Sequence, residues 1–112
     1  MTRYAVKERT IGEAVNDGGL LVVAQWEAEA GEADRIAGIL DRFLPQAQAE
    51  PGVKLFLISR ATENPAQFLF YELFRDEAAF KAHQESAHFK THIAGEALPL
   101  LARRERAQYA LL

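Results

Sequence analysis

The 112-residue sequence contains no cysteine and only one methionine and one tryptophan. Without cysteine the chain cannot form a disulfide, a thiolate metal site or a cysteine nucleophile. It also lacks any apolar run near the ~18 residues that a membrane helix needs, and its first ten residues are too polar for a signal peptide. We therefore expect a cytoplasmic protein with no membrane partner.

An excess of positive charge is missing as well, because the formal net charge is -3. The lysines and arginines are scattered except for Arg103, Arg104 and Arg106, which alternate with Glu105 where a C-terminal strand should begin. Charges of this kind are typical of a solvated sheet edge, so we assign the cluster no function. We also expect no nucleic-acid partner.

The composition is that of one globular domain, with 49% hydrophobic and 26% charged residues. A chain of this length can bury one core but not two. We expect residues 20–112 to form that domain and residues 1–19 to be an N-terminal extension. Within the extension, Thr10 and Glu13 have the spacing of a helix capping box.

Apolar periodicity predicts two helices and four strands. Apolar residues at helical spacing favour a helix over residues 32–49, although Pro45 should kink or break it near residues 41–44. Asp76 is placed to accept hydrogen bonds from the first amides of a second helix, which should end near residue 86. The predicted strands cover residues 20–29, 53–61, 66–75 and 105–112. Residues 88–102 predict a broken helical stretch, interrupted by Gly95 and Pro99.

The resulting order is βαββαβ, the split pattern of a ferredoxin-like α+β fold with helices on one face of an antiparallel sheet. Both faces of the strand at 66–75 are apolar: Phe68, Phe70 and Phe74 point one way, and Leu69, Tyr71 and Leu73 the other. The strand at 53–61 likewise sets Val53, Leu55 and Leu57 against Phe56 and Ile58. Because two helices cover only one face, we expect the other face to bind a second copy of the chain.

Three segments of the sequence carry a family pattern. They are Glu50-Pro51-Gly52 before the second strand, Asn64-Pro65 in the hairpin, and the run from Phe70 to Phe89. Within that run the matching residues are Glu72, Asp76, Ala79, His83, Ser86, His88 and Phe89. In residue type and spacing the chain from residue 20 to residue 112 resembles the antibiotic biosynthesis monooxygenase family. These proteins are small dimeric α/β barrels that include cofactor-independent quinol monooxygenases.

The resemblance implies oxidation of a phenolic or quinol-type small molecule by dioxygen, without a cofactor, in a homodimer. Family members that degrade haem use an asparagine on the first strand and a tryptophan on the third. Here the first strand has Trp26, and the third has Tyr71 and Phe74. We therefore do not expect haem degradation.

Cofactor-free oxygenation requires a deprotonated substrate, so the site must accept a proton. A phenol near pKa ~10 and an imidazole near ~6.5 differ by roughly 5 kcal/mol, which donors in the site must supply by stabilising the phenolate. We expect His83, on the inward face of the second helix, to be the proton acceptor or a substrate donor. We expect His88 to assist it, and Glu72 to be a third catalytic residue.

Aromatic side chains should hold a flat substrate and exclude water. The expected substrate-binding residues are Trp26, Tyr71, Phe80, Ser86 and Phe89. Other interpretations remain open: His83 could be a core imidazole bonded to Glu72 or to a backbone carbonyl, or could move a proton in an isomerase or tautomerase. The protein could also be a non-catalytic dimer that binds a small molecule, or one in which these side chains only join strand to helix.

Metal binding has weak support in the sequence. His88 and His92 have the i, i+4 spacing of half a metal site. No third ligand or HExxH pattern accompanies them, so we expect no metal.

Overall fold

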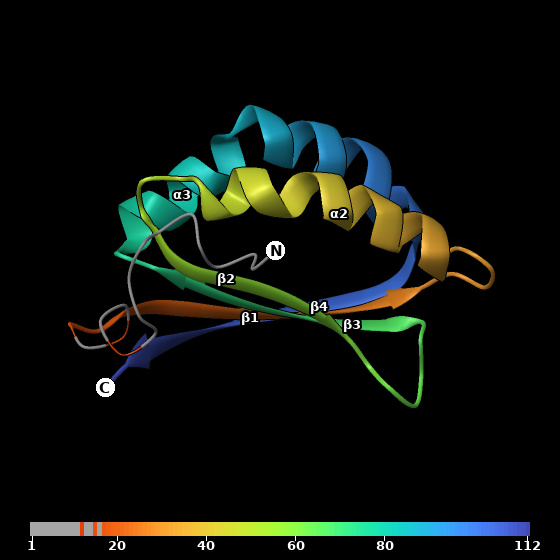
Figure 1. The fold of residues 1–112 in the computed structure, drawn as a ribbon, viewed down its shortest axis with the longest axis horizontal. Helices are drawn as coiled ribbons and strands as arrows, with labels where there is room; N and C mark the ends of the chain where they lie inside the picture. Colours follow the sequence, from red (N-terminus) through yellow and green to blue (C-terminus); the bar gives the residue numbers. More distant parts are fainter. Residues whose placement is uncertain (1–11, 13–14, 16) are drawn as a thin grey trace.

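The computed structural model describes residues 12, 15 and 17–112. Strands β1 (Gly19–Ala28), β2 (Val53–Arg60), β3 (Gln67–Phe74) and β4 (Leu101–Leu111) form one antiparallel sheet in the order β2-β3-β1-β4. Helices α2 (Ala33–Gln48), α3 (Glu77–Glu85) and η2 (Phe89–Ala97) lie over one face of it (Figure 1). The predicted α+β ferredoxin-like βαββαβ fold is therefore confirmed.

Of the extension expected at residues 1–19, residues 1–11, 13, 14 and 16 lie outside the described residues, among them Thr10 and Glu13 of the predicted capping box. In the part of the chain that is described, no helix is long and apolar enough to cross a membrane.

Of the expected kink or break, the break does not occur, because helix α2 continues through Pro45 to Gln48. Proline removes the hydrogen bond that its N–H would donate to the carbonyl of residue 41. This loss falls on the solvent side of the helix, where Asp41 and Pro45 are exposed. Leu44 and Ala47 are buried on the other side, and their packing in the core stabilises the helical conformation of the residues after Asp41.

The helical stretch before β4 is also more regular than expected. It is a π-helix, η2, followed by a 3-10 turn, η3 (Leu98–Leu100), that contains Pro99. Gly95 lies inside η2 and does not interrupt it. A Cβ at Gly95 would stand only 3.2 Å from the carbonyl oxygen of Lys90, so glycine lets the backbone close this wide turn.

Strand β4 begins at Leu101 rather than at residue 105. Its pairing with β1 sets Arg103 opposite Glu27, Arg104 opposite Trp26 and Arg106 opposite Ala24. A strand at the sheet edge needs only backbone pairing, so charged side chains do not end it. The arginines thus lie within the strand, and alternate ones share the face of the core.

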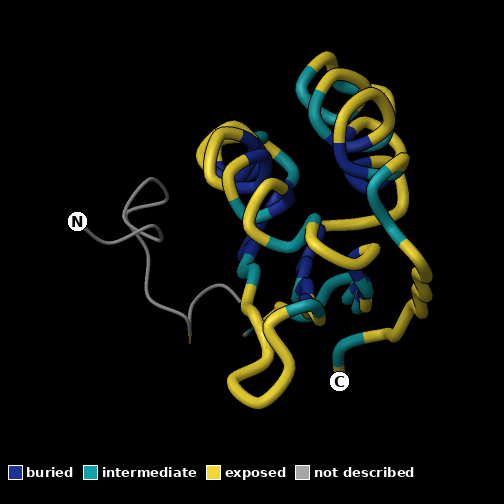
Figure 2. The backbone as a smooth tube through the Cα atoms, turned by 90° about the vertical axis from the view of Figure 1, so that its right-hand side faces the viewer, coloured by how far each residue is buried: buried dark blue, intermediate teal, exposed yellow. Residues whose placement is uncertain are grey.

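The core lies between the sheet and the helices, and Figure 2 shows the buried residues gathered there. Phe68, Phe70 and Phe74 belong to it, as the alternation predicted. Val53 also belongs to it, although we expected it on the opposite face. The register shifts between Val53 and Leu55, which leaves Lys54 as an inserted residue and turns Val53 inward.

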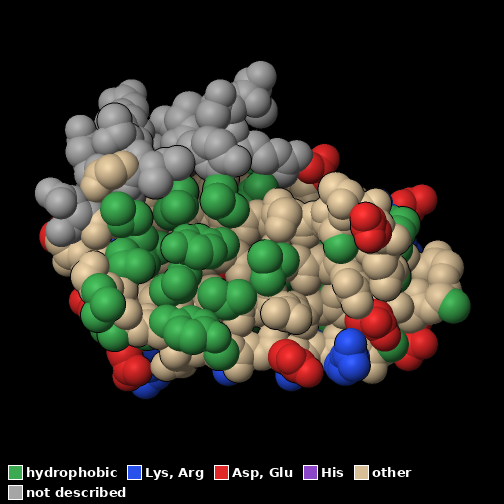
Figure 3. Space-filling view, turned by 90° about the horizontal axis from the view of Figure 1, so that it is seen from below, with side chains coloured by type: hydrophobic (Ala, Val, Ile, Leu, Met, Phe, Trp, Pro, Cys, Tyr) green, Lys and Arg blue, Asp and Glu red, His purple; other side chains and the backbone are tan. Residues whose placement is uncertain are grey.

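The helix-free face of the sheet carries an apolar patch (Figure 3). Its members are half-buried or exposed side chains on all four strands: Leu21, Val23, Leu57, Leu69, Tyr71 and Tyr109. Tyr109 is 52% exposed and Leu69 is 42% exposed. We call this set the outer patch.

The start of α3 follows the prediction. Asp76 is the N-cap, and its Oδ1 accepts a hydrogen bond of 2.8 Å from the backbone N–H of Ala79. This bond fixes the strand-to-helix junction that aims the inward face of α3 at the sheet.

Replacing Asp76 by alanine should lower the free energy of unfolding by about 1 kcal/mol, because the Ala79 amide loses its acceptor. Urea titration measures this change. Asp76→Asn is the matched control, since its side-chain oxygen can still accept the bond. Equal losses in both variants would show that the cap contributes nothing.

Candidate active site

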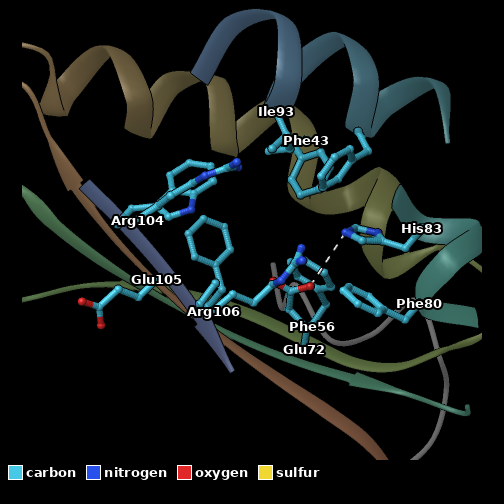
Figure 4. A pocket seen from close by; sticks show the side chains of 13 residues that line it. Phe43, Phe56, Glu72, Phe80, His83, Ile93, Arg104, Glu105 and Arg106 are labelled. Carbon is cyan, nitrogen blue, oxygen red and sulfur yellow. Dashed lines mark ion pairs between the residues drawn. The ribbon is translucent and has the colours of Figure 1, made fainter. Parts of the chain in front are cut away.

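A cavity of about 260 Å³ lies between the inward face of the sheet and the helices (Figure 4). Its aromatic walls are Trp26, Phe43, Phe56, Phe70, Phe80 and Phe89. Its polar lining includes Glu72, His83, Arg104 and Arg106. The volume is just below the ~300 Å³ at which typical ligand pockets begin, so the cavity suits a small molecule.

His83 lies on the inward face of α3 with only 2% of its side chain exposed. Its Nδ1 is 2.7 Å from Oε2 of Glu50, so the Nδ1–H donates to that carboxylate. The hydrogen bond selects the tautomer in which Nε2 carries a lone pair. Nε2 lies 3.8 Å from Oε1 of Glu72, another cavity residue, and is therefore the nitrogen available to a ligand.

Glu50 connects the two histidines that the sequence singled out. The same oxygen, Oε2, accepts a second hydrogen bond of 2.6 Å from Nε2 of His88. His88 does not line the cavity; it shares this carboxylate with His83, and the two ring centroids are 6.4 Å apart. Glu50 appeared in the sequence as part of the Glu-Pro-Gly turn, and that reading missed its contacts. Its two partners lie 33 and 38 residues away, a separation that no local pattern reveals.

Glu50, His83 and His88 are also the group of described residues that could hold a metal ion, since their ligand atoms all lie within 4.8 Å of one another. Ligand atoms around tetrahedral zinc are roughly 3.3 Å apart, given bonds of about 2.0 Å. The contacts of 2.6 and 2.7 Å are shorter and fit N–H···O hydrogen bonds. His92, the other half of the pair noted in the sequence, instead contacts Glu96 at 2.6 Å.

Glu72 is a buried carboxyl on β3 that faces the cavity. Burial raises its pKa to about 8, the positive charge of Arg106 partly opposes this, and the negative charge of Glu50 adds to it. At neutral pH the group is therefore mostly a neutral acid that can donate a hydrogen bond. The 3.8 Å between Nε2 of His83 and Oε1 of Glu72 is too long for a hydrogen bond, so the two groups meet only as a longer contact (Figure 4).

Ser86 and Tyr71 lie outside the cavity lining. The Ser86 hydroxyl donates to the His83 carbonyl at 2.7 Å and accepts from the Phe89 N–H at 3.2 Å, so it shapes the turn from α3 into η2. Tyr71 is on the outer patch, because adjacent strand residues point to opposite faces. Neither reaches the position in which we expected it to bind substrate.

The other expected site residues meet at the cavity. These are Trp26, Glu72, Phe80, His83 and Phe89.

The arginines of β4 are exposed on an edge strand, as expected, but two of them also line the cavity, which was not expected. Arg104 and Arg106 line the cavity, and the Arg106 guanidinium stands 5.2 Å from the centre of the Phe80 ring. Sequence reasoning missed them because it started the strand after Arg104. The i, i+2 spacing, which puts two side chains on one face of a strand, is the signal that could have found them.

The model of the antibiotic biosynthesis monooxygenase family matches residues 19–95. The chain belongs to this family. A protein from Pseudomonas aeruginosa is 26% identical, with a TM-score of 0.76 over 85% of this chain and 95% of that one. A protein from Shewanella oneidensis is 19% identical, with a TM-score of 0.77 over 83% and 90% of the two chains. No curated protein matches the sequence.

A Nitrosomonas europaea protein named for the antibiotic biosynthesis monooxygenases is 22% identical, with a TM-score of 0.76 over 80% of this chain and 95% of that one. At 22% identity, the structural likeness establishes that the two chains share a fold. The chemistry must be argued from the cavity.

The raised pKa of Glu72 predicts a specific pH dependence of stability. Between about pH 4.5 and about pH 8 the unfolded state releases this proton while the folded state keeps it. Stability should therefore fall as pH rises through that window, by several kcal/mol at most, and level off above it. In Glu72→Gln this contribution should be absent.

Urea unfolding of both proteins at several pH values measures the effect. The difference between wild type and Glu72→Gln isolates this carboxyl from other titrating groups. A difference that does not change with pH would contradict the neutral Glu72.

Proposed function

We propose that the protein is a cofactor-independent monooxygenase that oxidises a phenolic or quinol-type small molecule with dioxygen. The observation that carries the proposal is the free Nε2 face of His83, held toward an aromatic cavity beside the buried acid Glu72. A base, a hydrogen-bond donor and a water-poor aromatic enclosure are what this chemistry needs.

The first step is removal of the substrate hydroxyl proton by Nε2 of His83. The Glu50 carboxylate, bonded to Nδ1–H at 2.7 Å, stabilises the imidazolium that forms. The neutral acid of Glu72 donates a hydrogen bond to the phenolate oxygen, and the charge of Arg106 favours the same anion. These groups supply the stabilisation that a lone imidazole lacks.

The phenolate then reduces dioxygen, and no further reductant is needed. One electron passes to dioxygen, and the resulting radicals combine to form a carbon–oxygen bond at a ring carbon ortho to the hydroxyl, a position that carries a hydrogen in a quinol or a para-substituted phenol. Loss of the ring hydrogen and cleavage of the O–O bond release one water and leave a quinone. One phenol and one dioxygen thus give one quinone and one water, so atoms and electrons balance.

The aromatic walls hold the ring flat and limit water. Trp26 and Phe70 lie 4.4 Å apart between ring centroids, and Phe43 packs edge-on near His83 at 5.8 Å. Planar faces and edges of this kind stack on a planar ligand. They also keep water from reacting with the radicals before these combine.

His88 completes the path of the proton. It shares Oε2 of Glu50 with His83, and its side chain is 15% exposed, against 2% for His83. A proton taken from substrate can therefore leave through the His83, Glu50 and His88 hydrogen bonds toward solvent.

His83→Ala should abolish oxygen uptake with a quinol substrate, because the cavity loses its proton acceptor. A Clark-type electrode measures uptake, and thermal melts show whether the variant is folded. Unchanged uptake together with a large drop in melting temperature would contradict the catalytic role and support a structural imidazole. Proton exchange into a product without oxygen uptake would favour an isomerase.

Glu50→Gln is the control that separates positioning from chemistry. The amide oxygen can still accept from Nδ1–H, but it no longer stabilises the imidazolium by charge. We expect a lower kcat with KM little changed. Loss of folding in this variant would show that the His83 to Glu50 bond is mainly structural.

We further propose that the enzyme works as a homodimer joined through the outer patch. Leu69 and Tyr109 are large apolar side chains exposed on the helix-free face, beside half-buried Tyr71 and Leu57. A contiguous apolar patch of this kind favours self-association, and a two-fold interface pairs it with itself.

Sedimentation equilibrium at micromolar concentration should give the mass of a dimer. Leu69→Lys should shift the protein to monomer, because it would bury a charge in the interface. Glu63→Lys, on the exposed hairpin loop, is the matched control and should remain dimeric. A wild-type monomer at that concentration would contradict the proposal.

A further inference from the structure

The mouth of the cavity carries positive charge on one strand. Arg104 and Arg106 are both exposed residues of β4, and both line the cavity. They are two residues apart, so their side chains leave the same face of the strand, the face that pairs with Trp26 and Ala24 of β1. Both side chains therefore reach the cavity from the same strand, Arg106 near Phe80 and Arg104 farther from His83 (Figure 4).

Glu105 lies between the two arginines in the chain and also lines the cavity, but among the described residues it forms no ion pair with either of them, and Figure 4 shows its carboxylate directed away from the other lining side chains. Arg104 makes no hydrogen bond or ion pair with any residue that the structure describes. Arg103, its neighbour on the opposite face, contacts Glu27 at 3.7 Å. The other acids near the site do not balance the two arginines, because Glu72 is mostly protonated and Glu50 is bonded to two histidines.

We infer that Arg104 selects phenolic substrates that carry a carboxylate. The inference rests on the proposed function for the hydroxyl end of the ligand and adds the recognition of its other end. A guanidinium presents a planar fork of N–H donors that matches a carboxylate and binds it more strongly than a neutral group.

The layout of the cavity fits such a molecule. Figure 4 shows Arg104 on the side of the cavity away from His83, with aromatic side chains between them. A flat hydroxyaryl acid can set its hydroxyl near His83 and Glu72, where Arg106 adds positive charge, and its carboxylate at Arg104. The alternative is that these arginines only prevent another strand from pairing with the sheet edge. That role could be filled by charges on either face of β4 and would not require them to line a cavity.

Calorimetric titration with two probes of the same shape tests the inference without requiring turnover. The probes are para-hydroxybenzoate, which is an anion, and para-hydroxybenzamide, its neutral counterpart. We expect wild-type protein to bind the carboxylate about tenfold more tightly than the amide, with a preference that weakens in high salt.

Arg104→Gln is the main variant, because Arg106 also packs on Phe80 and its loss would disturb the wall. This substitution should reduce the preference to near one while leaving amide binding unchanged. Arg103→Gln, on the opposite face of the same strand, is the matched control and should keep the wild-type preference.

Equal binding of both probes to the wild type, a preference that survives in Arg104→Gln, or binding of neither probe would overturn the inference. These results are independent of the reaction. Carboxylate selectivity without oxygen uptake would contradict the monooxygenase proposal alone. Oxygen uptake that requires His83 but is the same with a charged and a neutral phenol would contradict only the role of Arg104.

Discussion

The hydrogen bond between Nδ1 of His83 and Oε2 of Glu50 is the interaction on which the polar side of the cavity depends. A nearly fully buried imidazole needs a partner for its N–H, since an unsatisfied buried donor costs about 1–3 kcal/mol. Glu50 satisfies it from the turn after α2, while α3 carries the ring. The bond therefore joins two helices and, by fixing one nitrogen, decides that the other is free for a ligand.

Burial is the main cause of the raised pKa of Glu72, and the charge of Glu50 adds to it. With Glu50 holding the negative charge near His83, a second carboxylate on β3 would lie buried beside a like charge. Its pKa rises instead, and the cavity gains a donor in place of an anion. One fold thus gives two glutamates different roles: Glu50 is an acceptor for two histidines, and Glu72 is an acid facing the ligand space.

The sheet register determines which side chains join these groups. Alternation along β3 turns Glu72 and Phe70 toward the helices and Tyr71 toward the outer patch. The pairing of β4 with β1 does the same for the arginines, sending Arg104 and Arg106 inward and Arg103 outward. A shift of one residue in either strand would exchange these sets, so the cavity's chemistry is tied to backbone pairing.

The sequence by itself determined the order of elements, the two faces of β3, the cap at Asp76 and the placing of His83 inward, because each is a periodic or local property. The resemblance around His83 also led to the family. Only the tertiary structure decided that Glu50 rather than Glu72 bonds His83, that Pro45 does not end α2, and that Arg104 and Arg106 reach the cavity. The physical reason is that such contacts join residues far apart in the chain. Their partners are set by the packing of helices on a sheet and by strand register, which no short stretch of sequence contains.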